Sequence, residues 1–271
     1  MRIELRLIFQ KETFNGKKFI DLISHENILG FVPTFISSSS LDLVRKKLDV
    51  DSHYELIKSI EYDINLSLES ESLMGNSLSI RNPGLGGTLQ VFHWVVDEQI
   101  FHNIKFDTFL THPNFICGYA FDYEFVMWQS EESIHNYKYF ERDYSNLETK
   151  YDKTLMEKLI DVSKNPGRDV LLPGLYLMAS WKMWFGNNFY KFVPKEKLLN
   201  FEFANLIESN ESYTFINLYE DLSKSESEQN LVLLQKFRDW CEFDVIEQNL
   251  LGLSPKSKKT SNWFTKLFSK N

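Results

Sequence analysis

Cysteine is almost absent from this chain of 271 residues, which holds only Cys117 and Cys241. The two are far apart in the sequence and form no Cys-x-x-Cys pair, so they do not predict a local metal site. Both have apolar neighbours, and burial among apolar side chains raises the pKa of a thiol and lowers its reactivity. We therefore expect two reduced, inert core residues.

The sequence also lacks a long uninterrupted hydrophobic stretch. The longest one, residues 170–186, contains Pro173, Gly174 and Lys182 and is shorter than the roughly 20 residues that a membrane-spanning helix needs. Residues 1–7 alternate charged and apolar side chains, whereas a secretory signal has an apolar run. We therefore expect a cytoplasmic protein.

Motifs of known catalytic sites are missing as well. The chain has no Gly-x-Ser-x-Gly elbow, and the glycine-rich residues 82–88 lack the Gly-Lys-Ser/Thr ending of a phosphate-binding loop and lead into a predicted strand. No two histidines have the spacing of a local zinc pair; they are His25, His53, His93, His102, His112 and His135. We expect no catalytic residue, no cofactor and no metal.

One alternative is a metal-dependent hydrolase or nuclease whose site is assembled from residues far apart in the sequence. Asp122 and Glu124, with Glu148 and Lys150, could hold a divalent metal and orient a water molecule. However, residues 143–153 are too polar for the buried strand that would hold such a site rigidly. This alternative ranks second to a binding function.

The charge of the chain is unevenly distributed. It has 30 basic and 38 acidic side chains, a net charge of −8. Five of the lysines and no acid lie in residues 253–271, so the remainder carries 25 basic and 38 acidic side chains, or −13. Such a body repels nucleic acid and attracts basic partners, although the same charge also serves solubility alone. We expect a basic protein partner and no direct contact with nucleic acid.

Hydrophobic periodicity predicts an α+β fold with a mostly antiparallel sheet, helices packed on one face, and more helix in the C-terminal half. Alternation of apolar and polar residues favours strands, and apolar residues at helical spacing favour helices. The predicted strands are 2–9, 60–68 and an antiparallel meander of 88–96, 101–109 and 115–128, with a loop over 69–88. The predicted helices are 40–48, 154–163, 194–199 and 226–241.

We expect residues 1–252 to form a single α+β domain, with a possible weak internal boundary near 129–153. We expect residues 253–271 to form a flexible cationic tail, in which Trp263, Phe264, Leu267 and Phe268 would fall on one helical face beside lysines. Such a tail could make weak membrane contact, stay disordered or fold back on the acidic body. A peripheral membrane or scaffold protein is therefore a third alternative.

One segment resembles a known family. Residues 165–186, NPGRDVLLPGLYLMASWKMWFG, and residues 189–194, FYKFVP, resemble bacterial immunity proteins encoded beside polymorphic toxins, especially those paired with restriction-endonuclease-fold toxins. The resemblance covers about 30 residues and rests on a Pro-Gly and Trp/Phe-Gly pattern. It implies an α+β protein that binds one toxin domain, expected to degrade nucleic acid, and blocks its active site without catalysis of its own.

The contact surface expected for such an inhibitor combines carboxylates with aromatic anchors. Carboxylates steer a basic partner, whereas Trp and Tyr side chains supply most of the binding energy. The predicted partner-binding residues are Asp122, Glu124, Trp128, Glu131, Glu132, Trp181 and Trp184.

Overall fold

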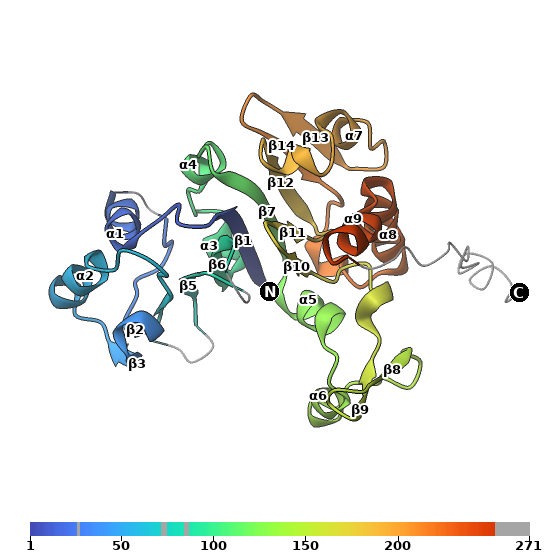
Figure 1. Ribbon diagram of the computed structural model, residues 1–271, viewed down its shortest axis with the longest axis horizontal. Coiled ribbons are helices and arrows are strands. Elements are labelled where there is room, and N and C mark those ends of the chain that lie inside the picture. The colour runs from blue at the N-terminus through green and yellow to red at the C-terminus, as the bar shows by residue number, and fades with distance from the viewer. Residues whose placement is uncertain (26–27, 72–74, 84–86, 253–271) are drawn as a thin grey trace, which may run out of the picture.

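The computed structural model describes residues 1–25, 28–71, 75–83 and 87–252 (Figure 1). The tail predicted for residues 253–271 lies outside these ranges. Within them the chain combines helices with a large antiparallel sheet, so the α+β class is confirmed.

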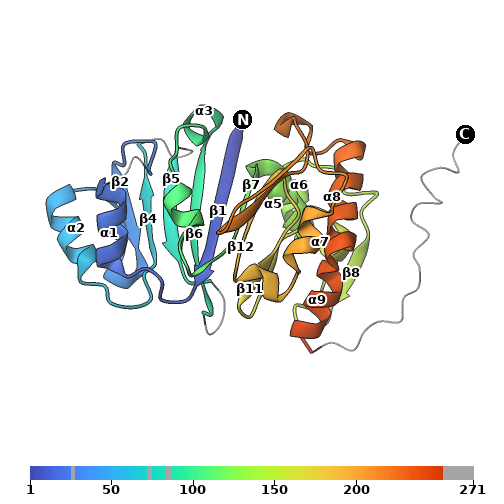
Figure 2. The ribbon, with the colours of Figure 1, turned by 90° about the horizontal axis from the view of Figure 1, so that it is seen from above.

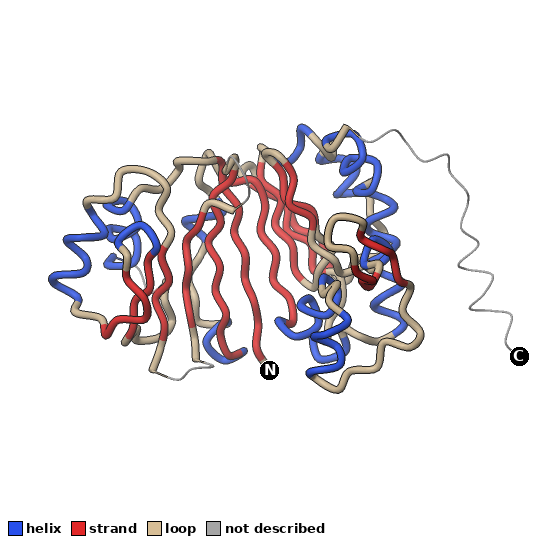
Figure 3. The backbone as a smooth tube through the Cα atoms, turned by 60° about the horizontal axis from the view of Figure 1, so that its bottom comes forward, coloured by secondary structure: helices blue, strands red, loops and turns tan. Residues whose placement is uncertain are grey.

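In the described residues the main sheet contains ten strands, which come from both halves of the chain. Its strands lie side by side across the molecule (Figure 3). All its neighbouring strands pair antiparallel. In spatial order they are β13 (Leu206–Ser209), β14 (Tyr213–Asn217), β12 (Lys182–Gly186), β7 (Phe115–Asp122), β1 (Arg2–Gln10), β6 (Leu89–Asp97), β5 (Ser77–Arg81), β4 (Leu66–Glu69), β2 (Phe35–Ser38) and β3 (Leu43–Lys47).

The N-terminal strand β1 lies at the centre of this sheet. The alternation of residues 2–9 predicts this strand, and it is confirmed, with Ile3, Leu5 and Leu7 fully buried on one face. The opposite face of β1 is also covered, because Glu4 and Ile8 are buried too. Elements therefore pack against both sides of the central strands.

On one face, the N-terminal helices cover the half of the sheet from β1 to β2. Phe92 of β6 shares this face with Leu7, its register partner on β1. The ring of Phe92 packs against Phe19 and Phe109. The helices of this part are α1 (Gly16–His25), α2 (Val50–Lys58), α3 (Glu98–Phe101) and α4 (Asp107–Leu110).

On the opposite face, the C-terminal helices cover the other half. Phe185 of β12 is the register partner of Cys117 on β7, and Cys117 is the register partner of Ile8 on β1, so Phe185 and Ile8 share a face. The ring of Phe185 stacks on Phe237 of α8. The prediction that helices pack on one face is therefore wrong (Figure 2). The helices here are α5 (Tyr123–Ser130), α6 (Ile134–Tyr139), α7 (Lys195–Leu199), α8 (Glu228–Cys241) and α9 (Phe243–Leu250). In the described residues, helix divides about equally between the two halves of the chain, so the expected C-terminal bias is also wrong.

This arrangement leaves one face of β2, β4 and β5 without a helix. Along β4, Leu66 and Leu68 are buried under the N-terminal helices, whereas Ser67 and Glu69 remain partly exposed on the other side. The alternation matches a sheet with one solvated face. The candidate site lies on that face.

Several predicted elements are wrong in type or extent. Residues 40–48 contain β3 in place of a helix, because the left-handed Asp42 (φ 53°) and Arg45 (φ 40°) are incompatible with helical continuation. The predicted strand 60–68 is reduced to β4, and β5 lies inside the predicted loop 69–88.

The predicted meander is also wrong. Residues 101–109 contain the end of α3 and most of α4, and β1 separates β6 from β7. The strand predicted over 115–128 ends at Asp122, whose carboxylate accepts from the N–H groups of Glu124 and Phe125 and thereby caps α5. Residues 154–163 form β9 (Glu157–Ile160) and the start of a 3-10 turn, not a helix. The helices predicted at 194–199 and 226–241 are confirmed as α7 and α8.

Candidate functional site

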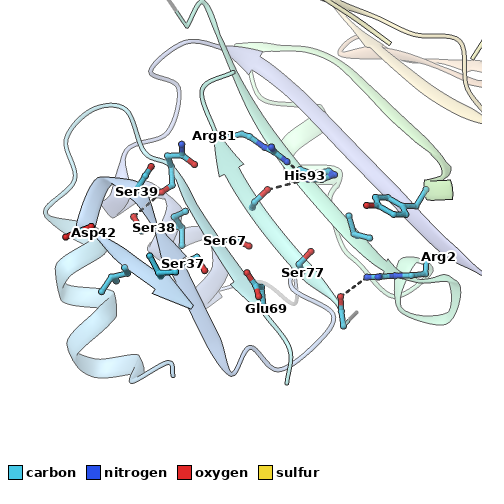
Figure 4. A pocket seen from close by; sticks show the side chains of 18 residues that line it. Arg2, Ser37, Ser38, Ser39, Asp42, Ser67, Glu69, Ser77, Arg81 and His93 are labelled. Atoms are coloured by element: carbon cyan, nitrogen blue, oxygen red, sulfur yellow. Dashed lines mark hydrogen bonds between the residues drawn. The ribbon is translucent and has the colours of Figure 1, made fainter. Parts of the chain in front are cut away.

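A polar groove with a volume of about 840 Å³ lies on the open face of the sheet (Figure 4). Its floor comes from β2, β4, β5 and β6. One wall contains Asp42, Leu43 and Val44, around the β2–β3 connection, and the other contains Arg2 and Tyr123. A groove of this size is large enough for a small molecule or a short segment of chain.

The floor of the groove carries a row of small hydroxyl side chains. Ser37, Ser67 and Ser79 are successive register partners on β2, β4 and β5, and the next partner, on β6, is His93. Side chains that are direct register partners project from the same face of a sheet. Four neighbouring strands therefore present three hydroxyls and one imidazole in line.

Two arginines lie toward opposite ends of the groove. Arg2 donates to the carbonyl of Gly75 (2.6 Å) and its guanidinium lies 5.9 Å from the ring centre of Tyr123. Arg81 Nη2 lies 2.8 Å from His93 Nδ1. In the described part of the chain, neither arginine forms an ion pair with a carboxylate.

The acidic residues of the groove lie on the side of the β2–β3 hairpin. Glu69 is 3.5 Å from Arg45 Nε, so its charge is partly balanced. Asp42 is exposed in a left-handed turn. The β5–β6 side of the groove is therefore the more positive one.

His93 connects the groove to a buried ion pair. A guanidinium only donates hydrogen bonds, so Arg81 is the donor in its contact with Nδ1 of His93. Nε2 is 2.6 Å from Oε1 of Glu4, which also accepts from Arg6 Nε. Burial raises the pKa of Glu4, but attraction to Arg6 and His93 and hydrogen bonds from both outweigh it, so this pKa lies below its usual value.

Arg6 extends the network toward the C-terminal half of the sheet. It donates to Asp169 and Tyr176, and the Tyr176 hydroxyl donates to the same carboxylate. Ser130 Oγ donates to the other oxygen of Asp169 (2.6 Å). Burial raises the pKa of Asp169, but attraction to Arg6 and these hydrogen bonds outweigh it, so this pKa also lies below its usual value. The carboxylates of Glu4 and Asp169 are therefore held ionised.

The sequence pattern does not predict the groove, because the polar composition of residues 69–88 favours a loop. Within them, Ser77 and Ser79 alternate with Leu78 and Ile80, which is the pattern of a strand with one polar face. That alternation is the signal from which β5 could have been predicted.

A second candidate surface is the lobe formed by residues 131–165, which projects from the sheet (Figure 1). It contains α6, β8 (Thr149–Asp152) and β9. A small apolar core, made by Trp128, Tyr137 and Ile160, holds it together. The Tyr137 hydroxyl also donates to the carbonyl of Trp128 (3.2 Å).

This lobe exposes many large apolar side chains. Of the 21 exposed large hydrophobic residues in the described ranges, six lie in it: Tyr139, Phe140, Leu147, Tyr151, Leu155 and Met156. Tyr139 and Phe140 form an edge-to-face pair with ring centres 5.0 Å apart. Exposed groups of this kind are typical of surfaces that bind other proteins.

Met156 differs from the other exposed residues of the lobe. It is 77% exposed and has a left-handed backbone (φ 54°) at the turn between β8 and β9. A non-glycine residue in this region costs about 1 kcal/mol or more, and an exposed side chain returns little packing energy. The turn therefore keeps a methionine where glycine would be less strained.

The predicted aromatic anchors are core residues in this structure. Trp128, Trp181 and Trp184 are 6%, 5% and 6% exposed, respectively. Trp184 packs against Phe106 and Phe215, and Lys182 covers the ring of Trp181. Their predicted role as surface anchors does not fit this structure, because alternation within 181–186 puts apolar side chains on both buried faces.

The predicted carboxylates have separate local roles. Asp122 caps α5, and Glu131 accepts from the backbone N–H of Ser133 (2.7 Å) and from Asn136 (2.8 Å). Glu132 pairs with Lys150. Glu124 has a side chain 73% exposed and lies 3.7 Å from Arg142. Their role in partner binding stays a prediction. Glu131 and Glu132 belong to the lobe, and Glu124 lies next to Arg142 of the lobe.

The residues considered for nuclease chemistry are engaged elsewhere. Asp122 caps a helix, Glu148 pairs with Lys164, and Lys150 pairs with Glu132. Across the described ranges, no group of three or more His, Cys, Asp or Glu side chains is arranged to hold a metal ion.

The two cysteines lie in the core. Burial raises the pKa of Cys117 to about 12 and also raises that of Cys241 well above its ordinary value. Both are 1% exposed or less. The expectation of buried thiols is confirmed.

Comparison with known proteins adds no relative. No family model, curated protein or solved structure matches this chain.

Among the helices of the described residues, none is both long and apolar enough to cross a membrane.

Proposed function

We propose that this protein is an immunity protein, which binds a basic toxin domain through the lobe at residues 131–165 and blocks the toxin's active site without catalysis of its own. The observation that carries the proposal is the concentration of exposed aromatic and aliphatic side chains on that lobe. Aromatic residues and methionine are enriched at protein interfaces.

The backbone at Met156 supports a binding role for the lobe. Strained backbone conformations are often found at functional sites, where the side chain has a use that offsets the cost. Met156 is exposed and strained at once. A methionine side chain adapts its shape to a partner surface, as at other binding sites rich in this residue.

Charge supports a basic partner. The chain without residues 253–271 has 25 basic and 38 acidic side chains. Glu124, next to Arg142 of the lobe, is largely exposed. Carboxylates around an apolar centre speed the encounter with a basic partner, whereas the apolar contacts slow dissociation.

The test is co-expression with the toxin encoded by a neighbouring gene. The wild-type protein is expected to restore growth of cells that produce the toxin. A variant with Tyr139→Ala and Met156→Ala is expected to restore it poorly, while Tyr62→Ala, which removes a similarly exposed tyrosine (67%) outside the lobe, is expected to act as wild type. Equal protection by all three proteins would exclude the lobe as the contact surface.

A further inference from the structure

The groove on the open sheet face is separate from the lobe, and its chemistry points to a ligand of its own. We propose that it binds an extended, acidic segment of a protein, with one carboxylate at Arg2 and a second at Arg81. This inference does not rest on the immunity function, because it uses none of the lobe residues.

Both ends of the groove carry an arginine without a carboxylate partner in the described residues. Arg2 contacts a backbone carbonyl and a tyrosine ring, and Arg81 contacts a histidine nitrogen, so within the described residues neither positive charge is balanced by a carboxylate. Arginine binds carboxylates through two parallel hydrogen bonds. Each end of the groove therefore offers a site for one carboxylate.

The length of the floor sets the shape of the ligand. The Arg2 guanidinium contacts the carbonyl of Gly75 at one end, and the Arg81 guanidinium contacts His93, the register partner of Ser79, four residues further along the chain than Gly75 (Figure 4). Four residues of strand span roughly 13 Å. Two acidic side chains four positions apart on an extended peptide have the same separation.

The floor between the arginines suits a peptide backbone. The strands of the floor use their N–H and C=O groups to pair with each other, so a ligand over β5 meets side chains, among them the hydroxyls of Ser67 and Ser79. Ser79 Oγ lies 3.4 Å from His93 Nδ1, whereas Ser37 Oγ, farther away on β2, already accepts from the backbone N–H of Arg45 (3.1 Å). A hydroxyl both donates and accepts. These groups can therefore satisfy the N–H and C=O groups of an extended segment.

Phosphate ligands and nucleic acid fit less well. Phosphate sites commonly use free N–H groups at a helix N-terminus. Here α5 begins at Tyr123 beside the groove, but Asp122 already accepts from the N–H groups of Glu124 and Phe125. Single-stranded nucleic acid needs several aromatic platforms, and Tyr123 is the only Phe, Tyr or Trp among the groove residues of the described chain.

The acidic side chains of the groove determine over which strands the ligand lies. Asp42, on the β2–β3 side, repels an acidic ligand, whereas Glu69 on the same side is partly neutralised by Arg45. The segment is therefore expected to lie over β5 and β6, close to Ser79 and His93.

Selection from a library of random displayed peptides tests the proposal and requires no identified partner. The protein is used as the full chain, next to an Arg2→Gln/Arg81→Gln variant and a Lys17→Gln/Lys105→Gln control. The control removes the same charge from exposed positions outside the groove. Thermal melting of each protein establishes that it is folded.

Wild type and control are expected to enrich peptides with two acidic residues four positions apart, and the groove variant is expected to lose this enrichment. For one selected peptide, each single arginine change should weaken binding about tenfold. Absence of enrichment, or equal enrichment on the groove variant, would overturn the proposal.

A competition experiment on the wild-type protein keeps the proposal testable even if the groove variant does not fold. Bound peptide is expected to be displaced by excess of the same peptide, but not by its version with glutamine for glutamate. Pyrophosphate is expected to compete only weakly. Displacement by pyrophosphate at lower concentration than by the acidic peptide would assign the groove to phosphate and overturn the acidic-segment proposal.

Discussion

Nε2 of His93 lies 2.6 Å from Oε1 of Glu4. His93 lines the groove on the open half of the sheet face, and Glu4 is 2% exposed beside Arg6, where the C-terminal elements cover the same face. Through Arg6 the contact continues to Asp169 and Tyr176. One chain of polar contacts thus connects the groove floor to the closed part of the molecule.

The first prediction concerns this buried pair. Burial alone would raise the pKa of Glu4, but attraction and hydrogen bonds from Arg6 and His93 lower it in the folded protein. Its contribution to stability is therefore complete above the pKa of an unfolded glutamate, about 4.3, and is lost as the pH falls through the lower folded value. The pKa of Asp169 is also lowered in the folded protein, so this carboxylate likewise stabilises the fold above its unfolded pKa and loses that contribution in acid.

Glu4→Gln should lower the free energy of unfolding at pH 7 by about 3 kcal/mol, since it leaves Arg6 with one buried carboxylate partner fewer. It should also reduce the loss of stability below about pH 5. Urea unfolding at a series of pH values measures both effects. Glu55→Gln is the control, because Glu55 pairs with Lys58 at the surface and should matter little. Equal effects of the two substitutions would contradict a stabilising role of the buried network.

The second prediction concerns the thiols. Burial raises the pKa of Cys117 to about 12 and raises that of Cys241 well above its ordinary value, so almost no thiolate exists at a mildly alkaline pH. Neither cysteine should react with a disulfide reagent in the folded protein, and both should react at once in guanidinium chloride. Rapid labelling of one thiol under native conditions would show that its part of the core opens.

The third prediction concerns the turn at Met156. Its left-handed backbone favours glycine, so Met156→Gly should raise the free energy of unfolding by about 0.5–1 kcal/mol. Lys153→Gly in the same turn is the control, because Lys153 has no left-handed backbone and glycine there should destabilise. Chemical denaturation of both variants measures the difference. If Met156→Gly destabilises as much as the control, the backbone at this position is not strained.

Elements with a strong local signal could be predicted from the sequence. Residues 2–7 alternate charged and apolar side chains and lie in β1, and Pro194, which cannot continue a preceding helix, directly precedes α7 as its N-cap. Residues 40–48 show the limit of such signals. Leu41, Val44 and Leu48 have helical spacing, but Arg45 takes a left-handed backbone in a strand that pairs with β2, and pairing with another strand is not visible in a local pattern.

The candidate site was harder to predict for the same reason. Ser37, Ser67 and Ser79 come from three strands and become a row only through their register. The tryptophans at 181 and 184 have the residue type of binding hot spots, but they lie where both faces of the sheet are covered. Exposure depends on the tertiary fold, so residue type alone selected buried side chains.

The most direct test of the central claim is the affinity of the protein for the toxin domain encoded beside it, measured by biolayer interferometry for wild type, the Tyr139→Ala/Met156→Ala variant and the Tyr62→Ala control. Loss of interface hot spots typically weakens binding by roughly 10- to 100-fold. A loss of this size is expected for the lobe variant, mainly through faster dissociation, and wild-type affinity is expected for the control. A neighbouring gene product that neither binds the wild-type protein nor harms cells lacking it would contradict the immunity function, and equal affinity of all three proteins would contradict binding through the lobe.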